Sequence, residues 1–486
     1  MSQRRASEGG VFTDYDLDPN YYDEMFGTDG SARQACKRLN AALAELAPED
    51  LTRLQEGVYR HFLHEGITFT VLDAERATEQ IIPIDCVPRV LTGAEWEHIE
   101  RGLKQRLTAL NLFLKDVYHD GRCLRDKVVP IDLVLGCPQY RMEMRGLKVP
   151  HDVYVAVCGT DIVRTNDGFA VLEDNLRVPS GVSYMLACRN AIKDAFPRLY
   201  RAHRVREVAD YAERLYSTLA SLRPSLQDPQ VAILTPGIHN SAYYEHAFLA
   251  GEMGIHLVEG QDLVLRDGAL HMRTTAGLRR VDVLYRRIDD DYLDPVMFRG
   301  ESVLGAAGLF HAYRTGNLVL ANAPGTGVAD DKSLYSYVPA IIRYFLGEEP
   351  VLANVETHLC REPDGLAYTL EHLEELVVKE VGGAGGYGML VGPHASAEER
   401  ATYAERVRAD PANFISQPVL ALSRAPCFVG GAIEPRHVDL RPFVLQGRDE
   451  QHVVPGGLCR VALRRGSLVV NSSQGGGCKD LWILED

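Results

Sequence analysis

The sequence between positions 161 and 181 reads DIVRTNDGFAVLEDNLRVPSG, and this pattern predicts a β-hairpin. Asn166-Asp167-Gly168 is a strong turn signal between two runs rich in β-branched residues. A three-residue loop would place Asp161 directly opposite Glu173, whereas a two-residue loop would leave them one position apart. Because strand side chains alternate between the two faces, Glu173 and Asn175 share a face.

The hairpin can bring three metal-binding groups together. The carboxylates of Asp161 and Glu173 and the amide oxygen of Asn175 are hard ligands, and Mg²⁺ is usually held by one or two carboxylates together with substrate phosphates. A solvated acidic edge strand is the alternative interpretation. Val171 and Leu172 favour burial, and unpaired buried carboxylates are costly, so we expect a metal site here.

A second informative stretch, positions 376–389, reads LVVKEVGGAGGYGM. An apolar strand ends near Lys379 and opens into a loop in which five of the seven residues from Gly382 to Gly388 are glycine, so backbone amides can approach a polyanion closely. The loop is not a Walker A motif, because no Gly-Lys-Ser/Thr follows it, and it differs from GxGxxG because the lysine precedes the glycines. A flexible hairpin with an exposed lysine is the alternative, although the glycines would then cost conformational entropy without a purpose.

Other residues that can bind anions occur near the glycine-rich segments. Lys332 follows Asp330-Asp331, an N-cap signal that predicts a helix start near Asp331, and a solvated lysine beside that cap is the alternative. Arg441 and Arg460 fall in predicted strands, where a guanidinium can hold phosphate or carboxylate through two hydrogen bonds. Surface ion pairing is the alternative for either arginine alone.

The composition is that of an acidic globular protein. The chain has 52 basic and 67 acidic residues, a net charge of −15 and 46% apolar residues. This charge argues against nucleic-acid and membrane-surface partners. We find no secretory signal, no apolar run of the ~18 residues that a membrane span needs, and no cysteine pair with zinc-ligand spacing, so we expect a cytoplasmic protein with reduced, mostly buried thiols.

Periodicity predicts an α/β or α+β chain with mixed sheets and five parts. The parts are a flexible arm over 1–30, a mostly helical region over 31–150, the hairpin region over 151–228, an α/β unit over 229–328 and the glycine-loop region over 329–486. Helices are predicted on either side of Ala47-Pro48, over 93–118 and over 198–222. Strands are predicted at 152–158, 170–173, 231–235, 255–258, 281–285, 318–321, 377–379, 414–422, 438–445 and 467–470.

Taken together, the motifs resemble a circularly permuted ATP-grasp protein. The family core runs from a first lysine to a strand lysine with a glycine loop, an adenine-contacting hinge, an Asp-x-Arg strand, an arginine strand, an Asn before Gly-Gly, and Asp…Glu-x-Asn. These correspond in order to Lys332, Lys379, Gln417-Pro418-Val419, Asp439/Arg441, Arg460 and Asn471 with Gly475-Gly476. Asp161…Glu173-x-Asn175 stands before them all, so the order is cyclically shifted, as in the bacterial group related to glutathionylspermidine synthases.

The resemblance spans about residues 70–486 and implies a role for each part of the chain. Residues 151–228 would form the permuted metal-binding part of the ATP-grasp core, 229–328 a pre-ATP-grasp-like α/β substrate domain, and 329–486 the nucleotide-binding subdomains. The glutathionylspermidine synthases carry an amidase domain or an arginine near the first metal ligand. This sequence has Gly159 two residues before Asp161 and has no amidase-sized segment. Specificity for glutathione or a polyamine is therefore not implied.

The resemblance also implies site residues. Lys332, Lys379 and Asn471 would bind the nucleotide, with Gly382, Gly383, Gly385 and Gly386 closing over its phosphates and Gln417 and Val419 presenting backbone groups to adenine. Asp161, Glu173 and Asn175 would bind Mg²⁺, two ions in all, and Arg441 or Arg460 would stabilise the transferring phosphoryl group.

Substrate-binding residues are expected in two places. Arg177 and Ser180 follow the hairpin, and Asn240, Tyr243, Glu245, Arg286 and Arg287 belong to the α/β unit. We expect them to line the pocket for the carboxylate or the acceptor. An interdomain salt-bridge network is the alternative for the charged members.

The implied activity is that of an ATP- and Mg²⁺-dependent carboxylate–amine ligase that works through an acyl phosphate. Its partners would be a small-molecule or peptide carboxylate and an amine acceptor. Phosphoryl transfer requires mainly positioning and charge neutralisation, which suits the residues found. A nucleotide-binding scaffold without turnover and a phosphotransferase are the alternatives.

Overall fold

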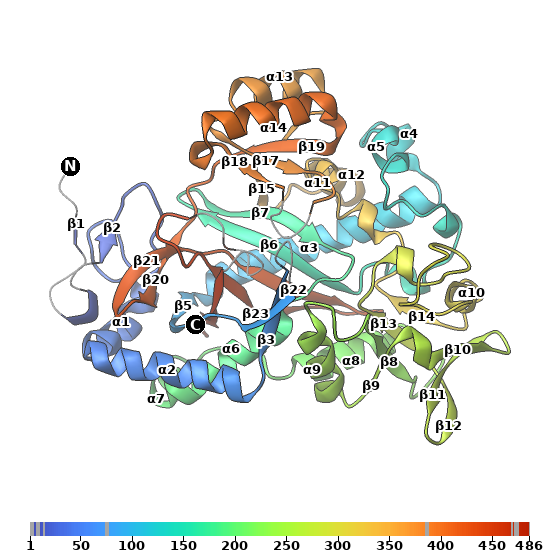
Figure 1. Ribbon diagram of the computed structural model, residues 1–486, viewed down its shortest axis with the longest axis horizontal. Helices are drawn as coiled ribbons and strands as arrows, with labels where there is room; N and C mark the ends of the chain where they lie inside the picture. The colour runs from blue at the N-terminus through green and yellow to red at the C-terminus, as the bar shows by residue number, and fades with distance from the viewer. Residues whose placement is uncertain are drawn as a thin grey trace.

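The computed structural model describes residues 4–5, 10–12, 15–72, 77–383, 388–467, 470 and 476–485. Its centre is a mixed seven-stranded sheet with the order β15-β7-β6-β22-β23-β24-β5 (Figure 1). N-terminal β5 pairs in parallel with C-terminal β24, and β6 pairs antiparallel with β22, so distant segments are neighbours. The strands are β5 (Ile84–Leu91), β6 (Val157–Thr165), β7 (Gly168–Asn175), β15 (Ala353–Asn354), β22 (Arg441–Gln446), β23 (Gln451–Val461) and β24 (Gly477–Ile483).

Helices cover both faces of this sheet. Val444 packs into the core on the side of α3 (Gly93–Tyr118), whereas its neighbours Phe443 and Leu445 pack into the core on the side of α6 (Val182–Ala195). This alternation follows from the two-residue period of a strand that is buried on both faces. The start of α3 is fixed by Thr92, whose hydroxyl accepts a hydrogen bond from the Glu95 amide at 3.2 Å.

A second, parallel sheet lies beside the first, with the order β14-β13-β8-β9. It carries helices, as parallel strands require for their crossovers, and a small antiparallel sheet of three strands extends from it (Figure 1). The elements of this α/β unit are β8 (Val231–Leu234), α9 (Tyr243–Met253), β9 (His256–Val258), β10 (Leu263–Arg266), β11 (Ala269–Thr274), β12 (Gly277–Arg280), β13 (Val283–Arg286), α10 (Leu309–Arg314) and β14 (Val319–Ala321).

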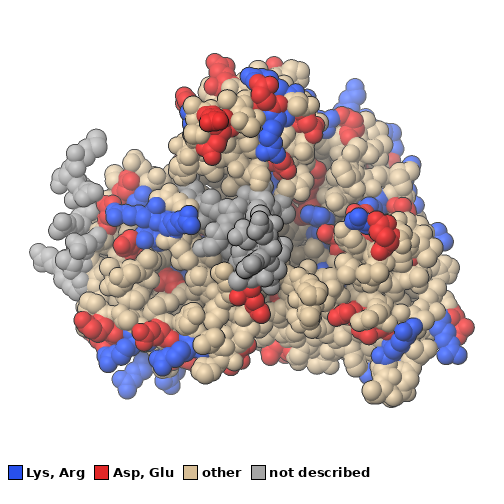
Figure 2. Space-filling view, in the orientation of Figure 1, with Lys and Arg blue, Asp and Glu red and all other residues tan. Residues whose placement is uncertain are grey.

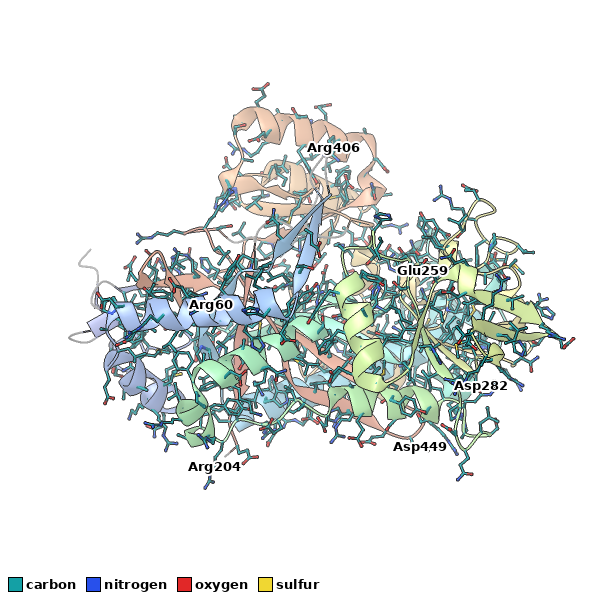
Figure 3. The ribbon with its side chains drawn as sticks, turned by 60° about the horizontal axis from the view of Figure 1, so that its bottom comes forward. Arg60, Arg204, Glu259, Asp282, Arg406 and Asp449 are labelled. Atoms are coloured by element: carbon teal, nitrogen blue, oxygen red, sulfur yellow. The ribbon has the colours of Figure 1, made fainter. Side chains whose placement is uncertain are left out.

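The glycine-loop strand belongs to a separate upper lobe (Figure 1). The lobe is an antiparallel sheet, β16-β19-β17-β18, covered by two helices, and it has its own small core around Val378 and Phe414. Arg406 of this lobe, labelled in Figure 3, bonds Glu380, the residue after Lys379. The elements are β16 (His358–Leu359), α13 (Pro363–Glu371), β17 (Leu376–Glu380), β18 (Leu390–Val391), α14 (Ala397–Ala409) and β19 (Phe414–Pro418).

Most of the predicted elements are confirmed. Helices α1 and α2 flank Ala47-Pro48, α3 covers the predicted range, and α11 begins after Asp331, whose side chain accepts from the Ser333 amide at 2.7 Å. The remaining elements are β1 (Arg4–Arg5), β2 (Asp16–Leu17), α1 (Lys37–Ala44), α2 (Pro48–His64), β3 (Thr68–Leu72), β4 (Ala77–Ile81), α4 (Arg122–Arg125), α5 (Ile131–Leu135), α7 (Pro197–Ala202), α8 (Tyr211–Ser221), α11 (Lys332–Tyr335), α12 (Val338–Leu346), β20 (Arg424–Val429) and β21 (Ala432–His437).

The predicted helix over 198–222 is wrong as a single element. It divides into α7 and α8, because the intervening segment pairs with the C-terminal end of the chain: the Arg206 amide donates to the Ile483 carbonyl at 2.8 Å. Helix α6 was not predicted, because it is buried on nearly every side and its apolar periodicity is weak.

Two other expectations need correction. Residues 15–30 are not a loose arm, because Tyr15, Met25 and Phe26 are buried in the core beside α6. The strand predicted at 152–158 begins only at Val157. The Ala156 amide donates to the side chain of Asn322 at 2.8 Å instead of to a neighbouring strand. The strand predicted at 467–470 includes residues outside the described part of the chain.

The general class predictions hold within the described part of the chain. The fold is a mixed α/β architecture with several sheets, and all ten cysteines are buried and free. Among the described helices, none has the length and apolar character of a membrane span. Figure 2 shows acidic and basic side chains interspersed over the coloured part of one face rather than one continuous basic surface.

Lys479 has a structural position in the central sheet. It is 1% exposed, its ammonium lies 2.7 Å from Asp85, and it donates to the carbonyls of Val87 and Pro426 at 2.9 and 2.7 Å. Lys479 therefore ties β24 to β5 and to β20, and its three N–H donors are all bonded within the protein.

We expect Lys479→Met to lower the free energy of unfolding by about 3–5 kcal/mol, because the carboxylate of Asp85 would stay buried without its partner. Urea denaturation followed by circular dichroism measures the change. Lys193→Met is the matched control: its side chain is 45% exposed and pairs with Glu207 at 3.7 Å, so it should change stability little. Equal losses in the two variants would contradict the structural role of Lys479.

Candidate functional site

The predicted hairpin is formed by β6 and β7, and its register places the two carboxylates opposite each other. Thr165 pairs with Gly168, so the turn has two residues, which alone would leave Asp161 and Glu173 one position apart. A bulge corrects this offset: Ile162 pairs with Val171 and Asp161 pairs with Glu173, leaving Leu172 as the extra residue. The bulge therefore decides which side chains converge.

Asp161 is held by two arginines from neighbouring strands. Arg441 binds both of its carboxylate oxygens, with Nη2 2.8 Å from Oδ2, and Arg460 Nη2 lies 2.6 Å from the same oxygen. Burial would raise the pKa of the Asp161 carboxyl, but the charges of Arg441 and Arg460 outweigh it and hold the pKa below its usual range. The two arginines therefore favour the charged form of Asp161, and Asp161 in turn orients both guanidinium groups.

Asp439 completes this cluster and was not assigned to the site from the sequence. Arg460 Nε lies 3.0 Å from each of its carboxylate oxygens, and Asp439 is 1% exposed. The signal was its position two residues before Arg441 in the Asp-x-Arg strand. The structure shows that Asp439 positions Arg460, because a guanidinium bonded on one edge presents its other edge to Asp161.

Glu173 is the more accessible carboxylate of the pair. Its side chain is 33% exposed, and it lies 3.9 Å from the Lys332 ammonium and 4.0 Å from Arg441. Burial and the negative charge of Asp161 raise the pKa of Glu173. A bound cation would relieve that repulsion, so the electrostatics of Glu173 favour a positive ligand.

The two predicted phosphate-binding lysines lie on the same side of the cluster. Lys332, the first residue of α11, donates to the carbonyl of Gly383, and Lys379 donates to the side-chain oxygen of Gln417 at 2.8 Å. Enclosure by the protein lowers the pKa of Lys379 to about 8, with Glu173 opposing this shift and Lys332 adding to it. The upper lobe and the central sheet therefore meet at a pair of ammonium groups.

The glycine loop and the hinge are only partly described. Gly382 and Gly383 lie within the described residues, whereas Gly385, Gly386 and Asn471 lie outside them. Gln417 pairs with Val377 in the lobe sheet, and its side chain binds Lys379, as noted above, and Thr357. The amide of Val419 donates to the Glu375 carbonyl at 3.4 Å.

The turn after β7 is clamped to the α/β unit. Asp330 accepts from the Leu176 amide at 2.8 Å and binds Arg177, and the side chain of Asn322 donates to the Leu176 carbonyl at 2.8 Å. The Ser180 carbonyl accepts from Arg441 at 3.3 Å. The ion pair of Arg177 with Asp330 therefore helps to position this turn. The Arg177 side chain is still 26% exposed.

Asn175 keeps an unused amide beside this turn. Its Nδ2 is buried and has no hydrogen-bond partner in the described part of the chain, and Asn175 pairs with Gly159 next to the Asp161–Glu173 pair. The unpartnered atom is the nitrogen, which cannot bind a cation; a hard cation would be bound by the side-chain oxygens of Asn175 and Glu173. No cluster of three His, Cys, Asp or Glu suited to a metal occurs among the described residues, so this carboxylate–amide set remains the candidate.

Three of the expected substrate residues are buried ion-pair residues. Glu245 is 0% exposed, accepts from the amides of Gly181 and Ser183 at 2.7 and 3.1 Å, and pairs with Arg287 at 2.9 Å. Arg286 is likewise 0% exposed and pairs with Asp290 at 2.7 Å. These residues hold the start of α6 and the end of β13, and the structure favours the salt-bridge alternative over substrate contact.

Asn240 and Tyr243 are placed differently. Both are partly exposed and follow β8 at the carboxyl edge of the parallel sheet, the edge at which α/β sheets bind ligands. Glu259, labelled in Figure 3, follows β9 at the same edge. Asn240 and Tyr243 remain the candidates for substrate contact in this unit.

We expect Glu245→Gln to lower the unfolding free energy by about 3 kcal/mol, because Arg287 would lose its buried counter-charge. Thermal unfolding of the purified protein measures this loss. Glu252→Gln, on the same helix but exposed, should leave stability nearly unchanged. An unaltered melting temperature in Glu245→Gln would return Glu245 to the list of substrate residues.

Comparison with known proteins agrees with the geometry. The model of a family described as circularly permuted ATP-grasp type 2 matches residues 88–462. An uncharacterized protein of Synechocystis sp. (strain ATCC 27184 / PCC 6803 / Kazusa) is 52% identical over 468 residues, which is 96% of this chain and 97% of that protein. An uncharacterized protein of Mycobacterium tuberculosis (strain ATCC 25618 / H37Rv) is 48% identical over 493 residues, with 99% and 88% coverage.

Two further similarities concern named proteins. A Frankia alni protein, whose name assigns it provisionally to the glutamate–cysteine ligases, is 40% identical over 470 residues; the match covers 96% of this chain and about half, 54%, of that protein. The structure of a glutathione synthetase-like effector from Globodera pallida superposes with a TM-score of 0.60 at 12% identity, covering 90% of this chain and 98% of the effector. With the family match over most of the chain, the conclusion is that this protein belongs to the circularly permuted ATP-grasp type 2 family.

Proposed function

We propose that this protein is an ATP-dependent carboxylate–amine ligase. The observation that supports it most is the convergence of four cationic side chains, Lys332, Lys379, Arg441 and Arg460, around Asp161 and Glu173, where the upper lobe meets the central sheet. Such a cluster neutralises a triphosphate and the charge that develops when its terminal phosphoryl group moves. The ligase name of the Frankia alni relative is consistent with this chemistry.

In this proposal Lys332 and Lys379 bind the nucleotide phosphates, and the glycine loop contributes backbone amides from Gly382 and Gly383. Glu173 and Asn175 would hold Mg²⁺, and Asp161 would join them through Oδ1, which accepts one arginine bond, whereas Oδ2 accepts two. When bound, Mg²⁺ neutralises phosphate charge. Arg441 and Arg460 face the transferring phosphoryl group.

The chemistry balances in two steps. A carboxylate oxygen of the first substrate attacks the terminal phosphorus of ATP, the bond from that phosphorus to the bridging oxygen breaks, and ADP leaves. The amine nitrogen of the acceptor then attacks the acyl carbon, phosphate leaves with the carbon–oxygen bond electrons, and the nitrogen releases a proton to water. The protein's contribution is to position the reactants and to neutralise charge.

The acid substrate is proposed to bind at the carboxyl edge of the parallel sheet. Asn240 and Tyr243 supply partly exposed polar groups there, and Arg177 and Ser180 border the turn that joins this edge to Glu173. A small-molecule or peptide carboxylate fits these groups, and we place the reaction in the cytoplasm.

Glu173→Gln should reduce turnover about 100-fold while leaving the fold intact, because the neutral side chain no longer favours a cation beside the phosphates. Incubation with MgATP, candidate amino acids and hydroxylamine would trap the acyl phosphate as a hydroxamate, and ADP release gives the rate. Asp167→Asn, in the exposed turn of the same hairpin, is the control and should retain full activity. Failure of the unmodified protein to release ADP with any candidate acid would refute the ligase proposal.

The affinity for ATP should depend on pH through Lys379. Because its pKa is about 8, the ammonium is present below that value and is lost as the pH rises through it, so ATP binding should weaken from pH 7 to pH 9. Calorimetry across this range measures the effect. In Lys379→Arg the charge persists at all these pH values, so its affinity should stay nearly constant. Parallel pH profiles in both proteins would show that Lys379 does not bind the phosphates.

A further inference from the structure

The bulge at Leu172 decides on which face of the sheet the proposed metal ligands lie. With a two-residue turn and an unbroken register, Asp161 would pair with Leu172. Glu173 would then pair with Thr160 and point to the opposite face. The bulge shifts the pairing by one residue, so Glu173 pairs with Asp161 and Asn175 follows on the same face. An interaction that holds the bulge therefore helps to form the cation site.

The stretch that carries these ligands has a neighbouring strand on one side only. β6 pairs with β7 along its length, whereas β15 pairs with Ala170 and Val171 alone. Within the described part of the chain, no strand pairs with residues 172–175 on the β15 side. Because a bulge also disrupts the ladder of backbone hydrogen bonds, this stretch depends on other groups to hold it.

The side chain of Tyr335 bonds the backbone next to the bulge. Tyr335 is the last residue of α11, which packs against β7, and it is 4% exposed (Figure 1). Its hydroxyl donates to the Val171 carbonyl at 2.5 Å and accepts from the Val355 amide at 2.7 Å. A hydroxyl that donates one bond and accepts another therefore links β7 to the chain just after β15 ends.

Two further side chains anchor the same stretch. Asn322, which is 1% exposed, accepts from the Val157 amide at 2.9 Å and donates to the carbonyls of Val157 and Leu176 at 2.7 and 2.8 Å. It joins the start of β6 to the end of β7. On the opposite face, Arg106 Nε binds both carboxylate oxygens of Asp174 at 2.9 and 2.8 Å. These two anchors lie beyond the bulge, toward the end of β7.

We propose that Tyr335 is a positioning residue for the cation site. Its hydroxyl holds the carbonyl of Val171, the residue directly before Leu172, and so keeps the bulge in place. The bulge in turn keeps Glu173 on the face of Asp161. Tyr335 thus acts through β7 rather than through a bond to the cation. The inference rests on the proposed function, because a cation at Glu173 is part of that proposal.

The first experiment measures the affinity for Mn²⁺, used in place of Mg²⁺, in Tyr335→Phe, which loses the hydroxyl and keeps the buried ring. Mn²⁺ is titrated into the full-length protein saturated with ADP, and the electron paramagnetic resonance signal of free Mn²⁺ reports binding. We expect the dissociation constant to rise about threefold to tenfold, below the effect of removing a group bonded directly to a ligand. The Val355 amide, 3.3 Å from the Val171 carbonyl, limits the loss.

Tyr337→Phe is the matched control, because the Tyr337 hydroxyl bonds Glu362 at 3.2 Å, next to α13 of the upper lobe. It should bind Mn²⁺ as the unmodified protein does. Equal Mn²⁺ affinity in Tyr335→Phe and in the control would overturn the proposal. ADP affinity without a divalent ion should change less than about twofold in Tyr335→Phe, since the phosphate-binding lysines remain. An equal loss of ADP and Mn²⁺ affinity would indicate a general structural defect and would also overturn the proposal.

The second experiment separates this role from the ligase proposal. In Tyr335→Phe, the Mg²⁺ concentration for half-maximal ADP release should rise by the same factor as the Mn²⁺ dissociation constant. At saturating Mg²⁺, kcat should return to within about twofold of the unmodified value, because only the affinity for the cation is affected. A kcat that stays low at saturating Mg²⁺ would overturn the positioning role. Weakened Mn²⁺ binding in Tyr335→Phe, with no ADP release by the unmodified protein, would overturn the ligase proposal and leave the positioning role standing.

Discussion

The ion pairs around Asp161 are the interaction on which the site depends. Three strands of the central sheet, β6, β22 and β23, contribute to them, and Asp439 holds Arg460 from the other side. A buried carboxylate without partners would cost several kcal/mol, so the two arginines are required wherever Asp161 is buried. With Lys332 and Lys379, four cationic side chains stand against three carboxylates, Asp161, Glu173 and Asp439, so the cluster carries one net positive charge. One set of interactions therefore joins distant parts of the chain and creates the local field that a polyphosphate needs.

The net charge of −15 and the cationic site are compatible for this reason. Most ion pairs on the surface compensate one another, whereas Lys332 and Lys379 face a single accessible carboxylate, Glu173. The pKa of Lys379 is lowered because its ammonium is enclosed by the protein and Glu173 neutralises it only in part. A triphosphate would supply the missing negative charge. The protein is acidic over its surface and cationic where the lobe meets the sheet.

The α/β unit contributes more to position than to charge. Glu245 and Arg287 fix the turn at Gly181, and Asp330 and Asn322 fix the segment at Leu176, so the chain that leaves the hairpin is held at both ends. Buried polar groups of this kind are costly unless they are fully bonded, and here nearly every one of them has a partner. Asn240 and Tyr243, at the edge of the parallel sheet, are in contrast partly exposed.

The sequence by itself determined the hairpin, the glycine loop after Lys379, the helix start at Asp331 and the permuted order of the motifs. These features follow from local patterns of turn, cap and strand residues, in which each residue's conformational preference acts over only a few positions. The roles of Glu245, Arg286, Arg287 and Lys479 could not be read this way, because a charged residue looks the same in sequence whether it binds a substrate or a buried partner far along the chain. The bulge at Leu172, the break between α7 and α8 and the ordering of residues 15–30 were likewise decided by tertiary contacts. Only the folded chain determines which partners are near enough to satisfy each buried group.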